Sequence, residues 1–270
     1  MSKTQKSKDQ GEMSFLDHLE ELRWHLIRAL VSVVIFGTIV FIFKEFVFDT
    51  IILAPKNNDF VTYEFFCGLS DLICFRPPEF TIMPRELGEQ FFTHIKVSIW
   101  LGIIISFPYI FWELWSFIKP GLYPKEQKAA RGIVFVCSFL FLLGVLFGYF
   151  VISPFAVTFL AGYSISSEVI NSPTLSSYVN YMTMFTIPTG IIFELPIVVY
   201  FLSRIGLVTP EFMRKYRRHA IIVILIFAAV ITPPDIVTQF LIGIPVFILY
   251  EISIYISGRA SKKYYSQSDG

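Results

Sequence analysis

The chain has 270 residues, of which 54% are hydrophobic and only 16% are charged. Soluble domains carry about 25% charged residues, so this chain has too few charges to cover a water-facing surface, and a soluble globular fold is nearly ruled out. The 22 basic and 21 acidic residues leave a formal net charge of +1, which argues against nucleic-acid binding because that function usually comes with a basic excess.

The N-terminal segment combines a polar tail with the start of a helix. Residues 1–13 contain no short apolar stretch that ends in a small-residue cleavage site, so they predict a disordered tail and not a signal peptide. Ser14 and Asp17 then match a helix-capping box. The apolar residues that follow at spacings of three and four predict an amphipathic helix lying in the membrane interface.

Six apolar segments are candidates for membrane spans, since a helix needs about 20 residues to cross a hydrocarbon core of roughly 30 Å. They comprise residues 24–43, 92–118, 132–153, 181–202, 219–232 and 236–257. In the fifth, the uncharged run 220–232 reaches only about 20 Å at the helical rise. We therefore expect an all-α bundle of six transmembrane helices with the last two short. A re-entrant hairpin is the alternative for this last pair.

The distribution of Lys and Arg predicts the orientation. If the N-terminus lies inside, the inside segments are 1–28, 119–131, 204–218 and 257–270, and they hold 17 of the 22 basic residues. This asymmetry satisfies the positive-inside rule, and an even number of spans then places both termini in the cytoplasm. With the acidic residues included, the inside carries a net charge of +9 and the outside −5.

The first outside loop, residues 44–91, is the longest segment between spans. Its apolar stretches at 46–53 and 60–66 predict short helices that cap the bundle, not a separate domain. We therefore expect one membrane domain over residues 14–258, followed by a cytoplasmic tail at 259–270.

Neither the cysteines nor the common signatures predict a metal site or a catalytic centre. Cys67 and Cys74 either pair, if their loop lies outside the cytoplasm, or remain two free thiols. Cys137 lies in an apolar run and is expected to be a packing residue. The sequence contains no P-loop, no H-E-x-x-H and no G-x-S-x-G, and its four histidines lack ligand spacing. No enzyme activity and no cofactor are predicted.

Three acidic residues fall within the predicted spans, and Glu194 is the deepest. It lies ten residues before Arg204 at the inner interface, or about 15 Å deep and near the midplane. A carboxylate there costs at least about 2.5 kcal/mol, so it must face a partner group or a wet cavity. A functional role and a structural hydrogen bond are equally good interpretations. Glu113 and Glu251 are shallow enough for interfacial water to reach them.

Several short motifs occur in order along the chain. They are His-Leu-Glu-Glu-Leu-Arg at 18–23, Phe107-Pro108, Trp115-x-Phe117-Ile-x-Pro120-Gly-Leu122, Phe-Glu-Leu-Pro at 193–196 and Thr-Pro-Pro-Asp at 232–235. In sequence and in topology they resemble the TatC family, the six-helix receptor of the twin-arginine protein translocase. The resemblance covers about residues 14–258, and only residues 67–84 of the first outside loop look like extra sequence.

The resemblance implies a binding site for the paired arginines of a folded substrate's signal peptide. In the family, carboxylates on the cytoplasmic face bind these arginines, and Glu21 and Glu126 are the matching positions. Two guanidinium groups suit carboxylate partners at a partly desolvated surface. Glu20 is expected to add to the same negative field, and Arg23 to orient the site.

The resemblance also implies partners within the membrane. Glu194 is similar to the family's membrane acid, which is expected to meet polar groups of the single-span TatA and TatB subunits. Asp235 and Gln239, near the outer ends of the short spans, resemble the surface where these partners dock. The apolar part of the signal peptide would lie along the concave face of the bundle. The implied protein is a self-associating subunit of the bacterial cytoplasmic (inner) membrane that exports folded precursors with the proton-motive force.

Two other functions were weighed against this one. A secondary transporter with Glu194 as its ion or proton site is the alternative, although the chain lacks paired broken helices and other midplane charges. An intramembrane protease would need a nucleophile–base pair, which the sequence does not offer. We therefore expect a binding and assembly protein.

Overall fold

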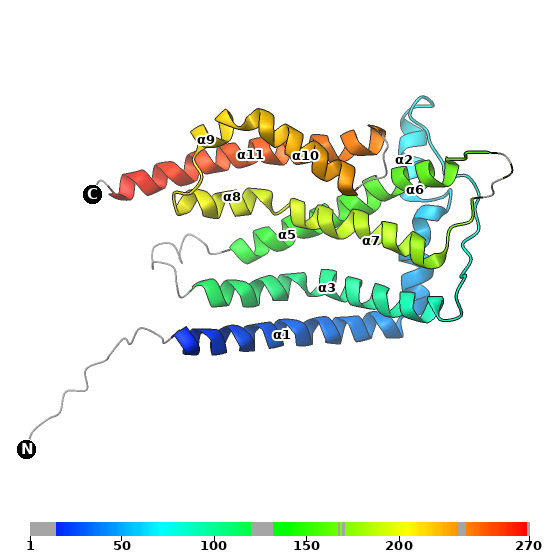
Figure 1. The fold of residues 1–270 in the computed structure, drawn as a ribbon, viewed down its shortest axis with the longest axis horizontal. Helices are drawn as coiled ribbons and strands as arrows, with labels where there is room; N and C mark the ends of the chain where they lie inside the picture. The colour runs from blue at the N-terminus through cyan, green and yellow to red at the C-terminus, as the bar shows by residue number, and fades with distance from the viewer. Residues whose placement is uncertain (1–14, 120–131, 167, 169–170, 232–235, 269–270) are drawn as a thin grey trace, which may run out of the picture.

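The computed structural model describes residues 15–119, 132–166, 168, 171–231 and 236–268, and the regular elements within these ranges are helices. In chain order they are α1 (Phe15–Ile42), the π-helix η1 (Phe46–Ile52), the 3₁₀-helix η2 (Ala54–Lys56), α2 (Val61–Leu69), α3 (Glu89–Ile118), α5 (Ile133–Phe147), the π-helix η4 (Gly148–Ile152), α6 (Ser153–Gly162), α7 (Leu175–Ile192), α8 (Leu195–Arg204), α9 (Pro210–Lys215), α10 (Arg217–Ile231) and α11 (Ile236–Ser268). The long helices run side by side, and η1 and α2 lie across one end of them (Figure 1). The all-α class expected from the sequence is confirmed.

Among the described residues, five helices are long and apolar enough to cross a membrane. They are His18–Ile42, Glu89–Ile118, Ile133–Gly162, Leu175–Arg204 and Thr238–Arg259. These correspond to the predicted first, second, third, fourth and sixth spans, and four of their ten ends differ from the prediction by three residues or more. The segment predicted as the fifth span forms α10, which has only 15 residues.

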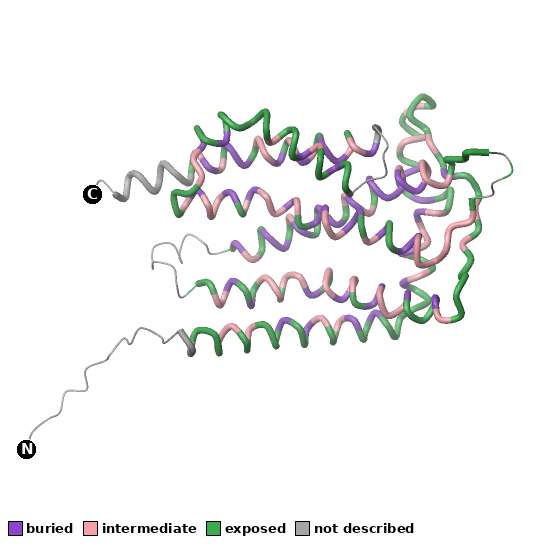
Figure 2. The backbone as a smooth tube through the Cα atoms, viewed as in Figure 1, coloured by how far each residue is buried: buried purple, intermediate pink, exposed green. Residues whose placement is uncertain are grey.

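The first span is longer than predicted, because α1 is one continuous helix of 28 residues from Phe15 to Ile42. The separate interfacial helix predicted near the N-terminus is therefore wrong, and its apolar spacing belongs to the first turns of the spanning helix. Most of the outward apolar side chains of α1 are exposed (Figure 2), as expected of a helix whose outer face meets lipid.

Small residues allow close approach between helices at two crossings. A Cβ added to Gly102 of α3 would lie 2.9 Å from the Cα of Gly37 in α1. A Cβ added to Gly148 of η4 would clash with the carbonyl oxygen of Phe185 in α7. Since lipid tails are as apolar as the helix surfaces, tight packing of this kind is a main source of attraction between membrane helices.

Buried apolar side chains among the described residues form four clusters, one of which joins α8, α9 and α11 through Val199, Met213 and Ile254. At the capped end they include Val40, Val47, Val97 and Val179. Toward the centre Ile152, Phe185, Ala228 and Ile242 join η4, α7, α10 and α11. At the opposite end Trp115, Ile133 and Cys137 join α3 to α5. The helices in the middle of the bundle are correspondingly the most buried (Figure 2).

Hydrogen bonds from α3 to α7 and to the preceding loop hold the capped end together. The carboxylate of the buried Glu89, at the first residue of α3, accepts bonds from the backbone N–H of Arg85 at 2.6 Å and from that of Ser176 in α7 at 2.7 Å. Lys96 of α3 donates to the side-chain oxygen of Asn180 in α7. The two short capping helices expected from the sequence are confirmed as η1 and α2.

The cysteines are in two different states. Cys67 and Cys74 form a disulfide with a Cα–Cα distance of 4.1 Å, so the structure contains the paired alternative of the two left open by the sequence. The bridge closes a short loop directly after α2. Cys137 is a buried free thiol within the apolar cluster that joins α3 to α5, as expected of a packing residue.

The C-terminal helix α11 packs along both α8 and α10. The hydroxyl of Ser203 in α8 donates to that of Ser257 in α11 at 2.7 Å, and both side chains are buried. Arg217 at the start of α10 forms an ion pair with Glu251 of α11. The first contact joins α8 to α11, and the second ties the short helix α10 to α11.

Candidate functional site

The acidic residues of the first motif lie in the first turns of α1, at the end of the bundle opposite the cap (Figure 1). Glu20 is exposed and Glu21 is half-buried. Neither forms an ion pair with a residue that the structure describes. Arg23 is exposed as well, with its guanidinium 5.8 Å from the centre of the Trp24 ring. Two carboxylates are thus presented at this end without a cation from the described part of the bundle.

Phe117 ties the end of α3 to this part of α1. Its ring meets that of His18 edge-on, with centroids 4.5 Å apart, and lies 6.1 Å from the ring of His25. Phe117 is the last but one residue of α3, and the segment that carries Pro120 and Glu126 follows directly in the chain. Pro120 and Glu126 lie outside the described residues.

Pro108 lies inside α3, which continues through it as one helix of 30 residues. Proline removes a backbone donor from a helix interior, and membrane helices tolerate this where neighbouring groups compensate. The residue therefore belongs to the second span, nine positions before Phe117, and does not end it.

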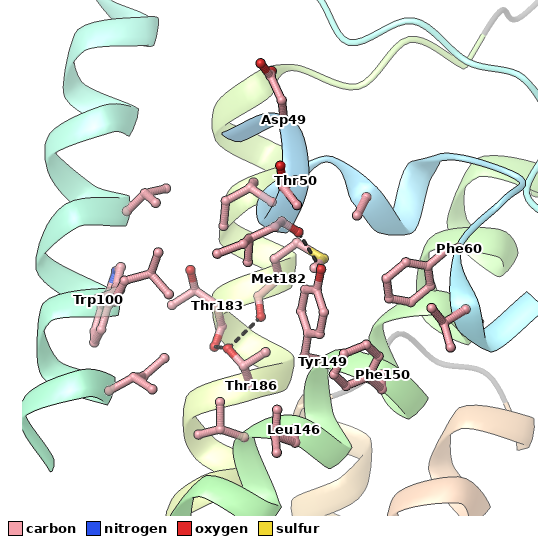
Figure 3. A pocket seen from close by; sticks show the side chains of 18 of the residues that line it. Asp49, Thr50, Phe60, Trp100, Leu146, Tyr149, Phe150, Met182, Thr183 and Thr186 are labelled. Carbon is pink, nitrogen blue, oxygen red and sulfur yellow. Dashed lines mark hydrogen bonds between the residues drawn. The ribbon is translucent and has the colours of Figure 1, made fainter. Parts of the chain in front are cut away.

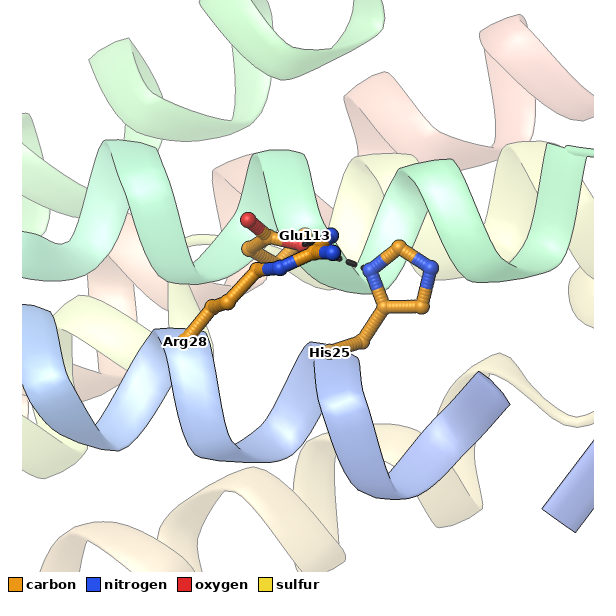
Figure 4. A network of polar contacts seen from close by, with 3 residues as sticks. All are labelled: His25, Arg28 and Glu113. Carbon is orange, nitrogen blue, oxygen red and sulfur yellow. Dashed lines mark hydrogen bonds and ion pairs between the residues drawn. The ribbon is translucent and has the colours of Figure 1, made fainter. Parts of the chain in front are cut away.

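A buried ionic cluster of His25, Arg28 and Glu113 (Figure 4), which was not predicted from the sequence, lies next to Phe117. Nδ1 of His25 in α1 donates to a carboxylate oxygen of Glu113 in α3 at 2.5 Å, and the Arg28 guanidinium lies 3.9 Å from the same oxygen. The Glu113 side chain is only 2% exposed. Tyr109, one turn earlier on α3, also faces this carboxylate. The expectation that interfacial water reaches Glu113 is therefore wrong.

Residue spacing contained a weak signal for this cluster. His25 and Arg28 are three positions apart, so both side chains project from the same face of α1. A charged residue within a membrane helix normally faces the bundle interior and pairs with another polar group. The sequence could not reveal that α3 supplies the partner.

Glu194 lies at the break between α7 and α8. Pro196 lacks the N–H that would bond to the carbonyl of residue 192, and α7 ends at that residue. The carboxyl group of Glu194 lies against the Cys137 thiol and the Phe141 amide of α5. Its Oε1 atom is buried and has no hydrogen-bond partner among the described residues. One polar atom is thus available for a group from another molecule.

Gln239 is half-buried in the first turn of α11 and donates from Nε2 to the carbonyl oxygen of Leu225 in α10 at 3.2 Å. It therefore links the two C-terminal helices. Asp235, predicted to act with it, lies outside the described residues. Of the two residues predicted to form the surface that binds partner subunits, the structure therefore describes only Gln239.

A cavity of about 680 Å³ opens toward the capped half of the bundle (Figure 3). Side chains of α3, α5, η4 and α7 line it together with residues 49–61 of the cap, among them Trp100, Leu146, Tyr149 and Met182. Its lining is mainly apolar, and its polar members include Asp49, Thr50, Asn57, Asp59, Thr183 and Thr186. Within the described residues, no group of three or more His, Cys, Asp and Glu side chains could hold a metal ion.

Comparisons with known proteins agree with this architecture. The family profile described as Sec-independent protein translocase protein (TatC) matches residues 17–245. The TatC of Blattabacterium from Periplaneta americana is 41% identical over 262 residues, covering 94% of this chain and 98% of the relative. TatCy of Bacillus subtilis is 32% identical over 253 residues, covering 94% of this chain and 92% of the relative.

A solved structure adds a three-dimensional match. A crystal structure of the twin arginine translocase receptor TatC aligns with a TM-score of 0.70 at 33% sequence identity, covering 90% of this chain and 99% of that one. The family, the multi-pass architecture and the role in transport thus follow from sequence and fold together. The chain belongs to the TatC family and is the receptor subunit of a Sec-independent, twin-arginine protein translocase, a transport protein and not an enzyme.

Proposed function

We propose that Glu21 and Glu126 bind the two arginines of a twin-arginine signal peptide, that Glu20 adds to their negative field and that Arg23 orients the site. The observation that carries this proposal is the placement of Glu21. It is half-buried beside an α1–α3 contact, and the chain that continues from α3 contains Glu126. A partly desolvated carboxylate without an ionic partner in the described bundle suits a guanidinium group from another molecule.

We propose six membrane crossings, with α10 as the fifth and both ends of the chain in the cytoplasm. The start of α1 and the end of α11 lie at the same end of the bundle, and α10 and α11 run in opposite directions (Figure 1). The 15 residues of α10 extend about 22 Å, well short of a hydrocarbon core of roughly 30 Å. A bilayer of the bacterial cytoplasmic membrane would thin locally around this pair.

We propose that Glu194, Asp235 and Gln239 meet single-span TatA- and TatB-type subunits in a multimeric complex. The unpaired Oε1 of Glu194 supports this role, since a buried acceptor without a donor is costly until another molecule supplies one. Energy would come from the proton-motive force. The alternative function was a secondary transporter that uses Glu194 as its ion site. Because the chain belongs to the TatC family, we set this alternative aside.

Crosslinking to a twin-arginine precursor in native membranes tests the signal-peptide site. We expect Glu21→Ala and Glu126→Ala each to lower crosslinking about tenfold, because losing one charged hydrogen bond costs about 1.4 kcal/mol or more. Glu20→Ala should have a smaller effect. Glu211→Ala, which removes an exposed acid from α9, is the matched control and should change nothing. Unchanged crosslinking in the Glu21→Ala/Glu126→Ala double variant would refute the assignment.

A further inference from the structure

One side of α2 is fixed to the third span. Tyr63 is fully buried, and its hydroxyl donates to the carbonyl oxygen of Pro55 at 2.7 Å. Burial raises the pKa of Tyr63 to about 12, so the hydroxyl keeps its proton at neutral pH. The Thr62 hydroxyl donates to the carbonyl oxygen of Phe150 at 2.5 Å, and the Phe66 ring meets that of Phe155 edge-on at 5.4 Å. These contacts determine which way the other side of α2 faces.

The other side of α2 is apolar and uncovered. Val61, Phe65 and Leu69 recur every four residues, so they lie along one face of the helix, and they are 65%, 64% and 66% exposed. Leu72 in the following loop is 96% exposed, and Ile73 is exposed beside it. A contiguous apolar face of this kind normally marks a surface that binds a protein or a membrane.

The disulfide and an aromatic stack hold this loop in place. The Cys67–Cys74 bridge brings the end of the loop back to α2, and the next residue, Phe75, stacks on Phe155 with ring centroids 3.9 Å apart. Residues 61–75, named here the cap hairpin, are therefore tied to the third span at both ends. The exposed Leu72 therefore lies in a loop that the disulfide closes and the Phe75–Phe155 contact holds against the third span.

The depth of the cap hairpin favours lipid as the group that covers it. Its anchors, Phe150 and Phe155, lie 17 and 22 residues beyond Ile133, the first residue of α5, or about 25 to 33 Å along the helix. The hydrocarbon core of a bilayer is roughly 30 Å thick. A bilayer whose inner boundary lies near the start of α5 therefore has its outer boundary at the level of the hairpin. In Figure 1, α2 lies across the ends of the spans, the direction of a helix in the plane of an interface.

The exposed face of the hairpin is also continuous with the lipid-facing surface of the spans. Leu146 and Phe150, both exposed on the third span, line the same hollow as Val61 of α2. Phe60, directly before α2, stacks on Phe150 with ring centroids 5.7 Å apart. The apolar surface thus passes from the spanning helix to the hairpin through touching residues.

We infer that the cap hairpin is an interfacial anchor, whose exposed face inserts into the acyl region of the outer leaflet. The hairpin carries Glu64 and Asp71 but no Lys or Arg, so its binding depends on apolar burial and not on anionic headgroups. Glu64 lies at the edge of the exposed face, where a carboxylate can stay in the headgroup layer. The acyl chains of a lipid, and not a charged headgroup, are therefore the ligand of this surface.

Depth-dependent fluorescence quenching in lipid nanodiscs tests the inference. The full chain carries Phe65→Cys labelled with NBD, a polarity-sensitive fluorophore, in a Cys137→Ala background with the native disulfide verified by mass spectrometry. The matched control places the same label at Glu64→Cys, one residue earlier on the same helix. Quenchers are a lipid with a doxyl group near the top of its acyl chain and aqueous iodide, which reaches both faces of a nanodisc.

We expect doxyl quenching at position 65 to be at least about twofold stronger than at position 64, and iodide quenching to be correspondingly weaker. Neither effect should change when anionic lipid is replaced by zwitterionic lipid. Equal iodide quenching at the two positions would overturn the inference, since the face would then lie in water. Protection of position 65 from both quenchers would also overturn it, because protein, such as a second copy of this chain, would then cover the face.

Discussion

At the scale of single residues, Glu113 combines deep burial with charged partners from another helix. Its side chain is 2% exposed, His25 donates to it at 2.5 Å and the Arg28 guanidinium lies 3.9 Å away. The residue types and their places within the spans were evident from the sequence, but the pairing was not. His25 and Glu113 are 88 residues apart, and helical periodicity does not indicate which two helices touch.

Removing the buried carboxylate should destabilise the protein strongly. Glu113→Ala leaves His25 without its acceptor, and breaking a buried ion pair costs about 3 kcal/mol or more. Glu251→Ala is the matched comparison, because its partner Arg217 is about half exposed and such pairs contribute at most about 1 kcal/mol. Equilibrium unfolding of the purified chain in detergent micelles measures both. Equal losses in the two variants would contradict the ranking.

A double-mutant cycle tests whether His25 and Glu113 act as a pair. His25→Ala, Glu113→Ala and the double variant should give a coupling energy of about 1 to 3 kcal/mol, because each side chain loses the same hydrogen bond. Energies that add within about 0.5 kcal/mol would show that the contact contributes nothing of its own.

Replacing Glu194 should not destabilise the isolated chain, in contrast to replacing Glu113. The Oε1 atom of Glu194 is buried without a partner among the described residues, so Glu194→Leu should leave the stability of the isolated chain unchanged or raise it by about 1 kcal/mol. Co-purification of single-span partners from native membranes should fall in the same variant, since the proposed contact is lost. A stability loss of several kcal/mol with unchanged co-purification would instead indicate a structural role.

At the scale of helices, hydropathy predicted most of the spans because each must present about 20 apolar residues to lipid. It missed the continuity of α1 through residues 15–23, where a polar face resembles that of an interfacial helix. Hydropathy also could not assign the length of α10, because the basic first turn of this helix is not part of the apolar run. Pro196 predicts the break before α8 only once the α7 helix is known to reach residue 192.

Small residues at helix crossings give the sharpest test of packing. Gly148→Ala puts a methyl group against the Phe185 carbonyl of α7, a clash between backbones that should cost about 1 to 3 kcal/mol. Gly162→Ala is the control, because nothing lies within 4 Å of its added Cβ. Thermal unfolding in one detergent compares the two. Equal midpoints would mean that η4 and α7 separate more easily than their packing implies.

At the scale of the whole molecule, the charge distribution accounts for both the predicted orientation and the candidate site. Glu21 is an acid at the end of the bundle that carries the basic excess, and the structure places it beside the α1–α3 contact. The family resemblance was needed to select it, since an acid on a solvated helix face is common. Glu126 and Asp235 lie outside the described residues and stay predictions.

The proposed orientation predicts which surface residues a membrane-impermeant maleimide can reach. Glu79→Cys, in the cap, should be labelled in intact spheroplasts, and Glu211→Cys, in α9, only after the membrane is permeabilised. Both positions are exposed, so accessibility is matched in the folded chain. Labelling of position 211 but not 79 in intact spheroplasts would reverse the topology.

The Cys67–Cys74 bridge connects the fold to the direction of insertion. Disulfides persist on the oxidising side of a bacterial membrane, whereas cytoplasmic thiols are kept reduced. A molecule inserted the wrong way round would carry two reactive thiols in place of the bridge, and the loop of its cap hairpin would no longer be closed covalently onto α2. The presence of the disulfide therefore reports the topology of each molecule. Alkylating the free thiols of Cys67 and Cys74 before reduction measures the fraction of inverted molecules in a population.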